Sequence, residues 1–208
     1  MADFDDAAAF WGRRYATPEF VFGRAPAAFL AREAKRLPPR SSVLVPCDGE
    51  GRNSVWLAEQ GHAVTAFDIT AEGVEKARAL ASERNVEIEA AVASIDDWDW
   101  TVRYDAVVAV FVQFAGPARR ARMFEEFAMA VQPGGLLMLH GYTPRQVDYG
   151  TGGPPHPENM YTPEMLKAAF SDWQIERLEA YEAELDEGKG HSGRSALIDL
   201  IGRKPQSL

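Results

Sequence analysis

The feature that most constrains this chain is a strand, a glycine turn, a helix start and a second strand in direct succession. Apolar residues 43–45 lead into the glycine turn at residues 49–51, a helix is predicted from Asn53, and residues 63–67 form an apolar run that ends at Asp68. Strands joined through a helix run parallel, whereas a tight two-residue turn produces an antiparallel pair. The segment therefore predicts an α/β fold built on a parallel sheet.

The same segment carries groups that can hold a nucleoside. Gly49 and Gly51 lack side chains, so the backbone can approach a ligand closely. The start of a helix offers unpaired N–H groups and the positive end of the helix dipole. Asp68 can accept hydrogen bonds from the hydroxyls of a ribose. We therefore expect a ligand containing a nucleoside at this turn.

Strand and helix patterns alternate along the chain, which is typical of a parallel sheet with helices on both faces. Residues 104–112 are almost wholly apolar, as expected of a central strand that is covered on both sides. The last two predicted strands are joined by a turn at residues 188–193 without a crossover helix, so they must pair antiparallel. Helices are predicted at residues 7–15, 26–36, 53–60, 71–84, 117–129 and 162–170, and strands at residues 42–45, 63–68, 87–92, 104–112, 136–140, 174–183 and 194–203, with a turn at residues 133–135.

Composition restricts the partners of this chain. With 31 acidic and 22 basic residues, the formal net charge of −9 argues against nucleic acid and anionic membranes. Cys47 is the only cysteine, so neither an intrachain disulfide nor a cysteine metal cluster is expected. No apolar run approaches the ~20 residues of a membrane helix, and no signal peptide is recognisable. We expect a cytoplasmic protein, either a monomer or a homodimer.

The length suits one domain. The 208 residues are expected to form a single domain, with residues 1–40 as a helical lid or cap and residues 41–208 as the ligand-binding core.

A nicotinamide dinucleotide is one possible ligand of the glycine turn. Such folds favour G-x-G-x-x-G with an acid ~20 residues further on. Here Ser54 stands at the third glycine position, and Asp68 follows Gly51 by 17 residues. Little chain remains after residue 150 for a separate catalytic domain, and the closing antiparallel hairpin fits a dinucleotide sheet poorly.

Further motifs follow in a fixed order. Residues 93–98 come after the third strand, residues 104–114 cover the fourth strand and its end, and residues 132–139 read Gln-Pro-Gly-Gly-Leu-Leu-Met-Leu. Together with residues 43–53 and Asp68, this order resembles class I S-adenosylmethionine-dependent methyltransferases along nearly the whole chain. Within that class, the Gly-Glu-Gly-Arg-Asn core and the short N-terminal helix resemble the tellurite-resistance-type methyltransferases of small molecules.

The resemblance implies a Rossmann-like sheet of seven strands, mostly parallel, with an antiparallel final strand and helices on both faces. It implies S-adenosylmethionine as the cofactor and S-adenosylhomocysteine as the product. The histidines of the chain could hold a metal, but no metal is expected, because no pair of them has the spacing of a helical or turn ligand motif. The implied cofactor-binding residues are Tyr15, Arg24, Cys47, Asp48, Gly49, Gly51, Asn53, Asp68, Ile69, Ser94, Ile95, Val110 and Gln113.

The chain departs from the family pattern at three positions. Val45 stands where the family usually has an acid, and Cys47 stands where it usually has a glycine. An acid that accepts from the adenine amino group is usual near Ser94, and Asp96 or Asp97 can take its place. The side chain of Cys47 narrows the backbone route past the methionyl part of the cofactor.

The N-terminal region is rich in aromatic residues: Phe10, Trp11, Tyr15, Phe20 and Phe22. They are either anchors that pack a helix over the sheet or a lid that keeps water from the methyl group. Tyr15 suits a lid best because its hydroxyl tolerates a wet edge. Arg24 is either a bidentate partner of the methionyl carboxylate or a plain surface arginine.

Methyl transfer from a sulfonium requires mainly orientation and a dry site, and the sequence contains no dyad, triad or metal-ligand motif. The catalytic candidates lie at carboxyl ends of strands, where ligands of open α/β sheets bind, or in the last hairpin. They are Gln113, His140, Tyr142, His191 and Arg194. Three histidines, His140, His156 and His191, could surround an anion together with Arg145 and Arg194.

The sequence therefore predicts methyl transfer from S-adenosylmethionine to a small molecule. The acceptor is a chalcogen oxyanion such as tellurite or selenite, a thiol or an amine. An NAD(P)-dependent oxidoreductase and a non-catalytic S-adenosylmethionine-binding module are the alternatives.

Overall fold

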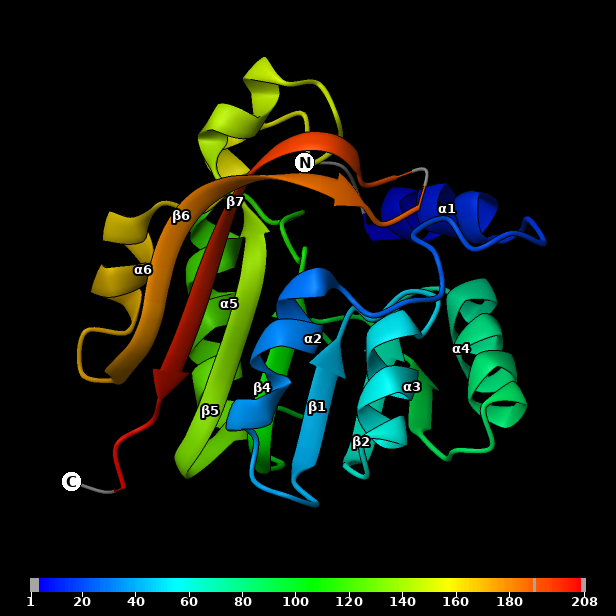
Figure 1. The fold of residues 1–208 in the computed structure, drawn as a ribbon, viewed down its shortest axis with the longest axis horizontal. Coiled ribbons are helices and arrows are strands. Elements are labelled where there is room, and N and C mark those ends of the chain that lie inside the picture. Colours follow the sequence, from blue (N-terminus) through cyan, green and yellow to red (C-terminus); the bar gives the residue numbers. More distant parts are fainter. Residues whose placement is uncertain (1–3, 189, 207–208) are drawn as a thin grey trace. The chain divides into compact units, whose positions relative to one another are not determined.

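The computed structural model describes residues 4–188 and 190–206, so Lys189 of the predicted hairpin turn lies outside the described residues. The strands are β1 (Ser42–Pro46), β2 (Ala63–Asp68), β3 (Glu89–Val92), β4 (Tyr104–Val110), β5 (Val131–Tyr142), β6 (Gln174–Asp186) and β7 (Ser192–Arg203). They are ordered β3-β2-β1-β4-β5-β7-β6 (Figure 1). This seven-stranded α/β sheet confirms the predicted fold class.

The described residues divide into two compact units. The first consists of residues 4–98 with 187, 188 and 190, and the second of residues 99–186 and 191–206.

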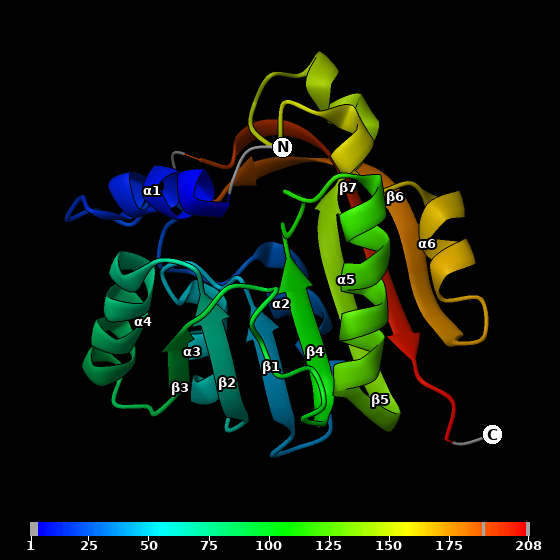
Figure 2. The ribbon, with the colours of Figure 1, turned by 180° about the vertical axis from the view of Figure 1, so that it is seen from behind.

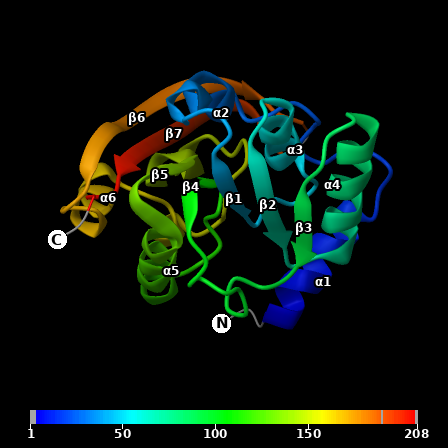
Figure 3. The same cartoon turned by 90° about the horizontal axis from the view of Figure 1, so that it is seen from below.

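In the first unit, β1 pairs with β2 and β2 pairs with β3, all in parallel. Its helices are α1 (Phe4–Tyr15), α2 (Ala28–Glu33), the 3₁₀ turn η1 (Ala34–Arg36), α3 (Arg52–Glu59) and α4 (Ala71–Glu83). Figure 3 shows α2 and α3 on the same side of β1 and β2. Apolar side chains such as Leu44, Leu57 and Phe67 are fully buried and form the core of this unit.

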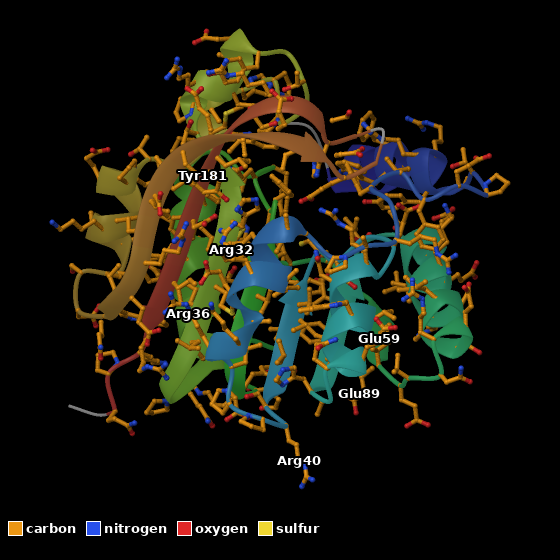
Figure 4. The ribbon with its side chains drawn as sticks, viewed as in Figure 1. Arg32, Arg36, Arg40, Glu59, Glu89 and Tyr181 are labelled. Carbon is orange, nitrogen blue, oxygen red and sulfur yellow. The ribbon has the colours of Figure 1, made fainter. Side chains whose placement is uncertain are left out.

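Two arginines of the first unit pair with one buried carboxylate. Arg32 and Arg36 flank Glu33, and each places its Nε 2.8 Å from a different oxygen of that carboxylate (Figure 4). Arg40, in the loop before β1, points away from the sheet (Figure 4).

In the second unit, β4 and β5 are parallel, and β7 lies between β5 and β6 and is antiparallel to both. Its helices are α5 (Pro117–Ala130) and α6 (Pro163–Ala169), with 3₁₀ turns η2 (Pro144–Asp148) and η3 (Pro157–Asn159). Helix α5 contacts β4 and β5, and α6 contacts β6 (Figure 2). The predicted antiparallel pairing of the last two strands is confirmed.

Several predicted strand boundaries are wrong. Strand β3 begins at Glu89 rather than residue 87, β6 ends at Asp186 rather than residue 183, and β7 begins at Ser192 rather than residue 194. Strand β4 ends at Val110 rather than residue 112, because Phe111 adopts a left-handed conformation with φ of 58°. The predicted turn at residues 133–135 lies inside β5 instead of preceding it. The pairing of β4 with β5 shifts there from Tyr104–Val131 to Ala106–Leu136, so the glycines form an irregularity within the strand.

Helix starts follow their capping residues. Thr70 and Thr162 each accept a backbone N–H three residues on, from Gly73 and Met165, at 3.2 Å, which confirms the predicted starts of α4 and α6. The helix predicted from residue 26 begins later, at Ala28. Ala27 is extended, and its N–H donates to a side chain of α3 instead of entering a helix.

Candidate functional site

Asp68 ends β2 and ties the glycine turn to the start of α4. Its Oδ2 accepts the N–H of Gly49 at 2.9 Å. Its Oδ1 accepts the N–H of Thr70 at 3.0 Å and the Thr70 hydroxyl at 2.7 Å. The carboxylate is 6% exposed, and burial raises its pKa. Asp68 is thus a buried, oriented acceptor beside the turn.

The two turn glycines are required for different reasons. Both adopt left-handed φ angles, 64° at Gly49 and 90° at Gly51, which favour glycine. A Cβ on Gly49 would lie 2.8 Å from the Tyr15 hydroxyl oxygen. A Cβ on Gly51 would lie 2.5 Å from the Cβ of Ala77 in α4. Gly49 therefore leaves room beneath the tyrosine, and Gly51 allows α3 and α4 to approach.

Tyr15 lies over the turn at the end of α1. Its ring stacks on Trp11 at 5.5 Å, and Trp11 also contacts Phe22 at 6.0 Å. Tyr15 is 5% exposed, and burial, followed by the negative charge of Asp68, raises its pKa, so its hydroxyl stays protonated. Phe10 is largely exposed.

The backbone conformation of Cys47 is one that favours glycine, the residue usual at this position in the family it resembles. Its φ is 53°, in the left-handed region that costs an L-residue roughly 1–2 kcal/mol. Its neighbour Asp48 accepts the N–H of Ser54 at 3.4 Å and also binds the Ser54 hydroxyl. Burial raises the pKa of Asp48 to about 6, although the Ser54 hydrogen bonds oppose this shift.

Among the other predicted cofactor residues of the first unit, the polar ones bind other protein groups and the two isoleucines are buried or half-buried. Asn53 uses its Oδ1 to accept the N–H of Ala27 at 3.0 Å. Arg24 is ion-paired with Glu83 of α4. Ser94 donates to Asp97 at 2.6 Å. Ile95 is buried and Ile69 is half-buried.

In the second unit, aromatic rings gather at the carboxyl ends of β4 and β5. Phe111 contacts the rings of His191, Tyr142 and His140, with centroids at 4.1, 4.7 and 4.8 Å. His140, Tyr142 and His191 are all buried. We call Phe111, His140, Tyr142 and His191 the aromatic cluster. Three of its members were predicted, and Phe111 was missed because its position depends on its left-handed backbone.

His140 is oriented by a buried carboxylate. Its Nδ1 lies 2.7 Å from Oδ1 of Asp199, which is fully buried in β7. Asp199 also accepts from Arg177 Nε at 2.9 Å and from the Tyr181 hydroxyl at 3.1 Å; Tyr181 lies on β6 (Figure 4). Sequence reasoning missed Asp199. A single acid among the apolar residues 196–201 could have indicated a buried carboxylate with a polar partner.

Gln113 binds backbone with both ends of its amide. Its Oε1 accepts the N–H of Tyr142 at 2.6 Å, and its Nε2 donates to the C=O of Tyr142 at 2.8 Å. A Cβ on Gly141 would lie 2.6 Å from this amide. Gln113 therefore extends the hydrogen bonding at the end of β5. Val110, also predicted, pairs with His140.

The three histidines and two arginines that could surround an anion are not gathered together. Arg194 and Arg145 both pair with Glu182 and have mostly exposed side chains. His156 is exposed and lies 3.5 Å from Glu158. His140 and His191 both contact the ring of Phe111.

Among the residues that the structure describes, no three His, Cys, Asp or Glu side chains are placed to hold a metal ion. The same part of the chain contains no helix long and apolar enough to cross a membrane.

Residues 43–135 match the family model described as "Methyltransferase domain". A curated relative, thiopurine S-methyltransferase of Pseudomonas putida, is 28% identical over 94% of this chain and 97% of its own length.

Two solved structures share the fold. The structure described as "Conversion of a Disulfide Bond into a Thioacetal Group during Echinomycin Biosynthesis" has a TM-score of 0.77 at 20% identity and covers 98% of this chain and 93% of that chain. TehB from Haemophilus influenzae has a TM-score of 0.70 at 21% identity and covers 95% of this chain and 66% of that chain.

The predicted enzyme class is confirmed. The family model over residues 43–135 and the relative that covers nearly the whole chain support a methyltransferase, and the fold is similar to that of TehB. The match to a methyltransferase domain favours the predicted methyl transfer over the nicotinamide alternative.

Proposed function

We propose that this enzyme transfers the methyl group of S-adenosylmethionine to the sulfur of a small aromatic thiol. The observation that carries the proposal is the match, over nearly the full length of both chains, to a relative named for S-methylation of thiopurines. A sulfur acceptor was among the predicted classes, alongside amines and chalcogen oxyanions.

The chemistry of the first unit supports cofactor binding at the glycine turn. A carboxylate has about four acceptor sites, and Asp68 uses three of them on Gly49 and Thr70. Oδ2, which accepts from Gly49 alone, keeps capacity for a ribose hydroxyl. Because Gly49 lacks a Cβ, the Tyr15 hydroxyl can lie close to the backbone of the turn. We assign Asp68 to the ribose and Gly49 to close backbone contact.

Tyr15 and the aromatic residues around it fit the role of a lid better than that of a plain anchor. Tyr15 is buried directly over Gly49, and its protonated hydroxyl can donate to an anionic or polar ligand group. When bound, the cofactor supplies an activated methyl group with a good leaving group. The residues of the chain then need only hold the acceptor in line and exclude water.

The aromatic cluster suits a flat, apolar acceptor. Phe111 is half-buried at the strand ends, where ligands of α/β sheets bind, and it packs on the buried rings of Tyr142 and His191. Amines and tellurite or selenite, which are polar or anionic, match this cluster less well. The exposed cations Arg145 and Arg194 are occupied by Glu182.

The test is a panel of acceptors matched in size, with formation of S-adenosylhomocysteine measured for each. The panel contains an aromatic thiol, an aliphatic thiol, an aromatic amine, selenite and tellurite. We expect the highest kcat/KM for the aromatic thiol. A higher kcat/KM for the amine or for either oxyanion would overturn the proposed acceptor and leave the enzyme class intact.

A further inference from the structure

The segment of residues 21–28, between α1 and α2, is held by side chains of the glycine turn and α3. Glu50 accepts the N–H of Val21 at 2.8 Å, and Asn53 accepts the N–H of Ala27 at 3.0 Å. Arg52 donates to the C=O of Phe22 at 3.2 Å. Glu50, Arg52 and Asn53 are each at most 6% exposed. An irregular segment is thereby fixed to the residues around Gly51.

The residues between β6 and β7 fit closely on the same segment. We call Glu187, Gly188 and Gly190 the hairpin tip. A Cβ on Gly188 would lie 2.6 Å from backbone atoms of Phe22 and Gly23. Gly190 donates its N–H to the C=O of Val21 at 3.3 Å, and a Cβ there would lie 2.3 Å from the Phe22 ring. Only glycines allow this approach.

A buried ion pair joins the hairpin tip to the start of α3. Nη2 of Arg52 lies 2.8 Å from Oε2 of Glu187, and both side chains are 7% exposed. Oε1 of Glu187 accepts the N–H of Ala28 at 2.9 Å. Both charged groups therefore have further hydrogen bonds, as a buried pair needs, and losing one partner would leave the other charge buried and uncompensated.

We propose that Arg52 and Glu187 are a positioning pair that couples cofactor binding at the glycine turn to docking of the hairpin tip. Arg52 directly follows Gly51, so a ligand that orders the turn also orders the backbone that carries Arg52. The ordered guanidinium of Arg52 pairs with the Glu187 carboxylate, and this ion pair keeps the hairpin tip docked on residues 21–28. Coupling of this kind is reciprocal, so a docked tip strengthens cofactor binding by the same factor. This inference rests on the proposed cofactor site.

The test is hydrogen exchange of the Val21 and Gly190 amides, with and without S-adenosylhomocysteine, in the wild type and in Glu187→Gln. The glutamine keeps an oxygen for the N–H of Ala28 and removes the charge that faces Arg52. In the wild type we expect S-adenosylhomocysteine to slow exchange at both amides at least fivefold. In the variant we expect this protection to disappear at Gly190 and the Kd of S-adenosylhomocysteine to rise about tenfold.

Two further variants separate positioning from stability. Arg52→Gln/Glu187→Gln removes both charges, so its thermal stability should exceed that of Glu187→Gln while protection at Gly190 stays lost. Glu184→Gln, an exposed position on β6, should behave as the wild type. The proposal is overturned if S-adenosylhomocysteine slows exchange of the Gly190 amide in Glu187→Gln as much as it does in the wild type.

The outcomes distinguish this inference from the proposed cofactor site. If S-adenosylhomocysteine binds the wild type and protects the amides of Gly49 and Gly51 but neither Val21 nor Gly190, the coupling is wrong and the cofactor site holds. If it binds without protecting the glycine turn, the cofactor site itself is wrong, and the coupling with it.

Discussion

Asp68 is the residue whose predicted role has the clearest structural basis. It was expected to bind a ribose because it ends the second strand. The structure adds that its carboxylate is buried and already orders Gly49 and Thr70. We therefore expect removal of this side chain to loosen the glycine turn and to weaken binding of the ribose.

For Asp68→Ala we expect the Kd of S-adenosylhomocysteine to rise about 10- to 100-fold, since hydrogen bonds to charged groups are worth about 1.5–3 kcal/mol. Titration calorimetry measures this change. Thr70→Ala is the matched control: it removes the cap of α4, which costs about 1 kcal/mol of stability, but keeps the carboxylate. Equal Kd values for Asp68→Ala and the wild type would show that the ribose is held elsewhere.

Cys47 supports a second prediction at the residue scale. Cys47→Gly relieves the left-handed strain and removes the Cβ from the turn, but it adds flexibility to the unfolded chain. We expect S-adenosylhomocysteine to bind several-fold more tightly, with the free energy of unfolding changed by at most about 1 kcal/mol. Cys47→Ala keeps the Cβ and should bind as the wild type does. If both variants behave alike, the Cβ does not obstruct the cofactor.

At the scale of elements, the glycine turn between β1 and α3 contains buried acids. Burial raises the pKa of Asp48 from 3.8 to about 6, and the pKa of Asp68 is also raised. A carboxyl whose pKa is higher in the folded state favours folding when it is protonated. The contribution of Asp48 to stability is therefore complete below about pH 4 and is lost as the pH rises through about 6.

We expect Asp48→Asn to flatten the pH dependence of the unfolding free energy between about pH 4 and 6, while the contribution of Asp68, whose pKa is also raised, stays in place. At pH 7 the variant should be more stable by up to about 3 kcal/mol, from about two pKa units. Urea unfolding across this range measures the effect. Asp99→Asn should leave the slope in place, because hydrogen bonds from Thr101 lower the pKa of that exposed acid. The prediction fails if the slope of Asp48→Asn equals that of the wild type.

Helices and strands were predictable where a local sequence signal marks a boundary. Thr70 and Thr162 cap their helices, and the alternation of apolar runs located all seven strands. The end of β4 just before Phe111 and the inclusion of Gly134 in β5 were not predictable. Neither residue type indicates by itself the backbone conformation or the strand pairing that it adopts here. Those boundaries depend on neighbouring strands.

At the scale of the whole molecule, cofactor choice has a direct thermal test. A ligand that binds only the folded protein stabilises it by about 2.7 kcal/mol at 100 times its Kd. For a protein of this size that corresponds to a rise in Tm of roughly 5–11 °C. We expect S-adenosylhomocysteine to produce this shift and NAD⁺ to produce none, measured by differential scanning fluorimetry. The reverse pattern would contradict the cofactor assignment.

Several predictions for the whole molecule stay predictions. These are the single domain with residues 1–40 as its cap, the cytoplasmic location, and the monomeric or homodimeric state. The predicted methyltransferase activity, in contrast, is supported by the match of residues 43–135 and by the full-length relative.

The sequence by itself determined the fold class, the glycine turn and the acid at the end of β2. These features depend on local periodicity, on glycine where φ is positive, and on the order of motifs, all of which are written in neighbouring residues. Only the tertiary structure decided which distant side chains meet. Arg52 pairs with Glu187, His140 with Asp199, and Gln113 with the backbone of Tyr142. Such partners lie far apart in the chain, and the packing of strands and loops, rather than any local pattern, brings them within hydrogen-bonding distance.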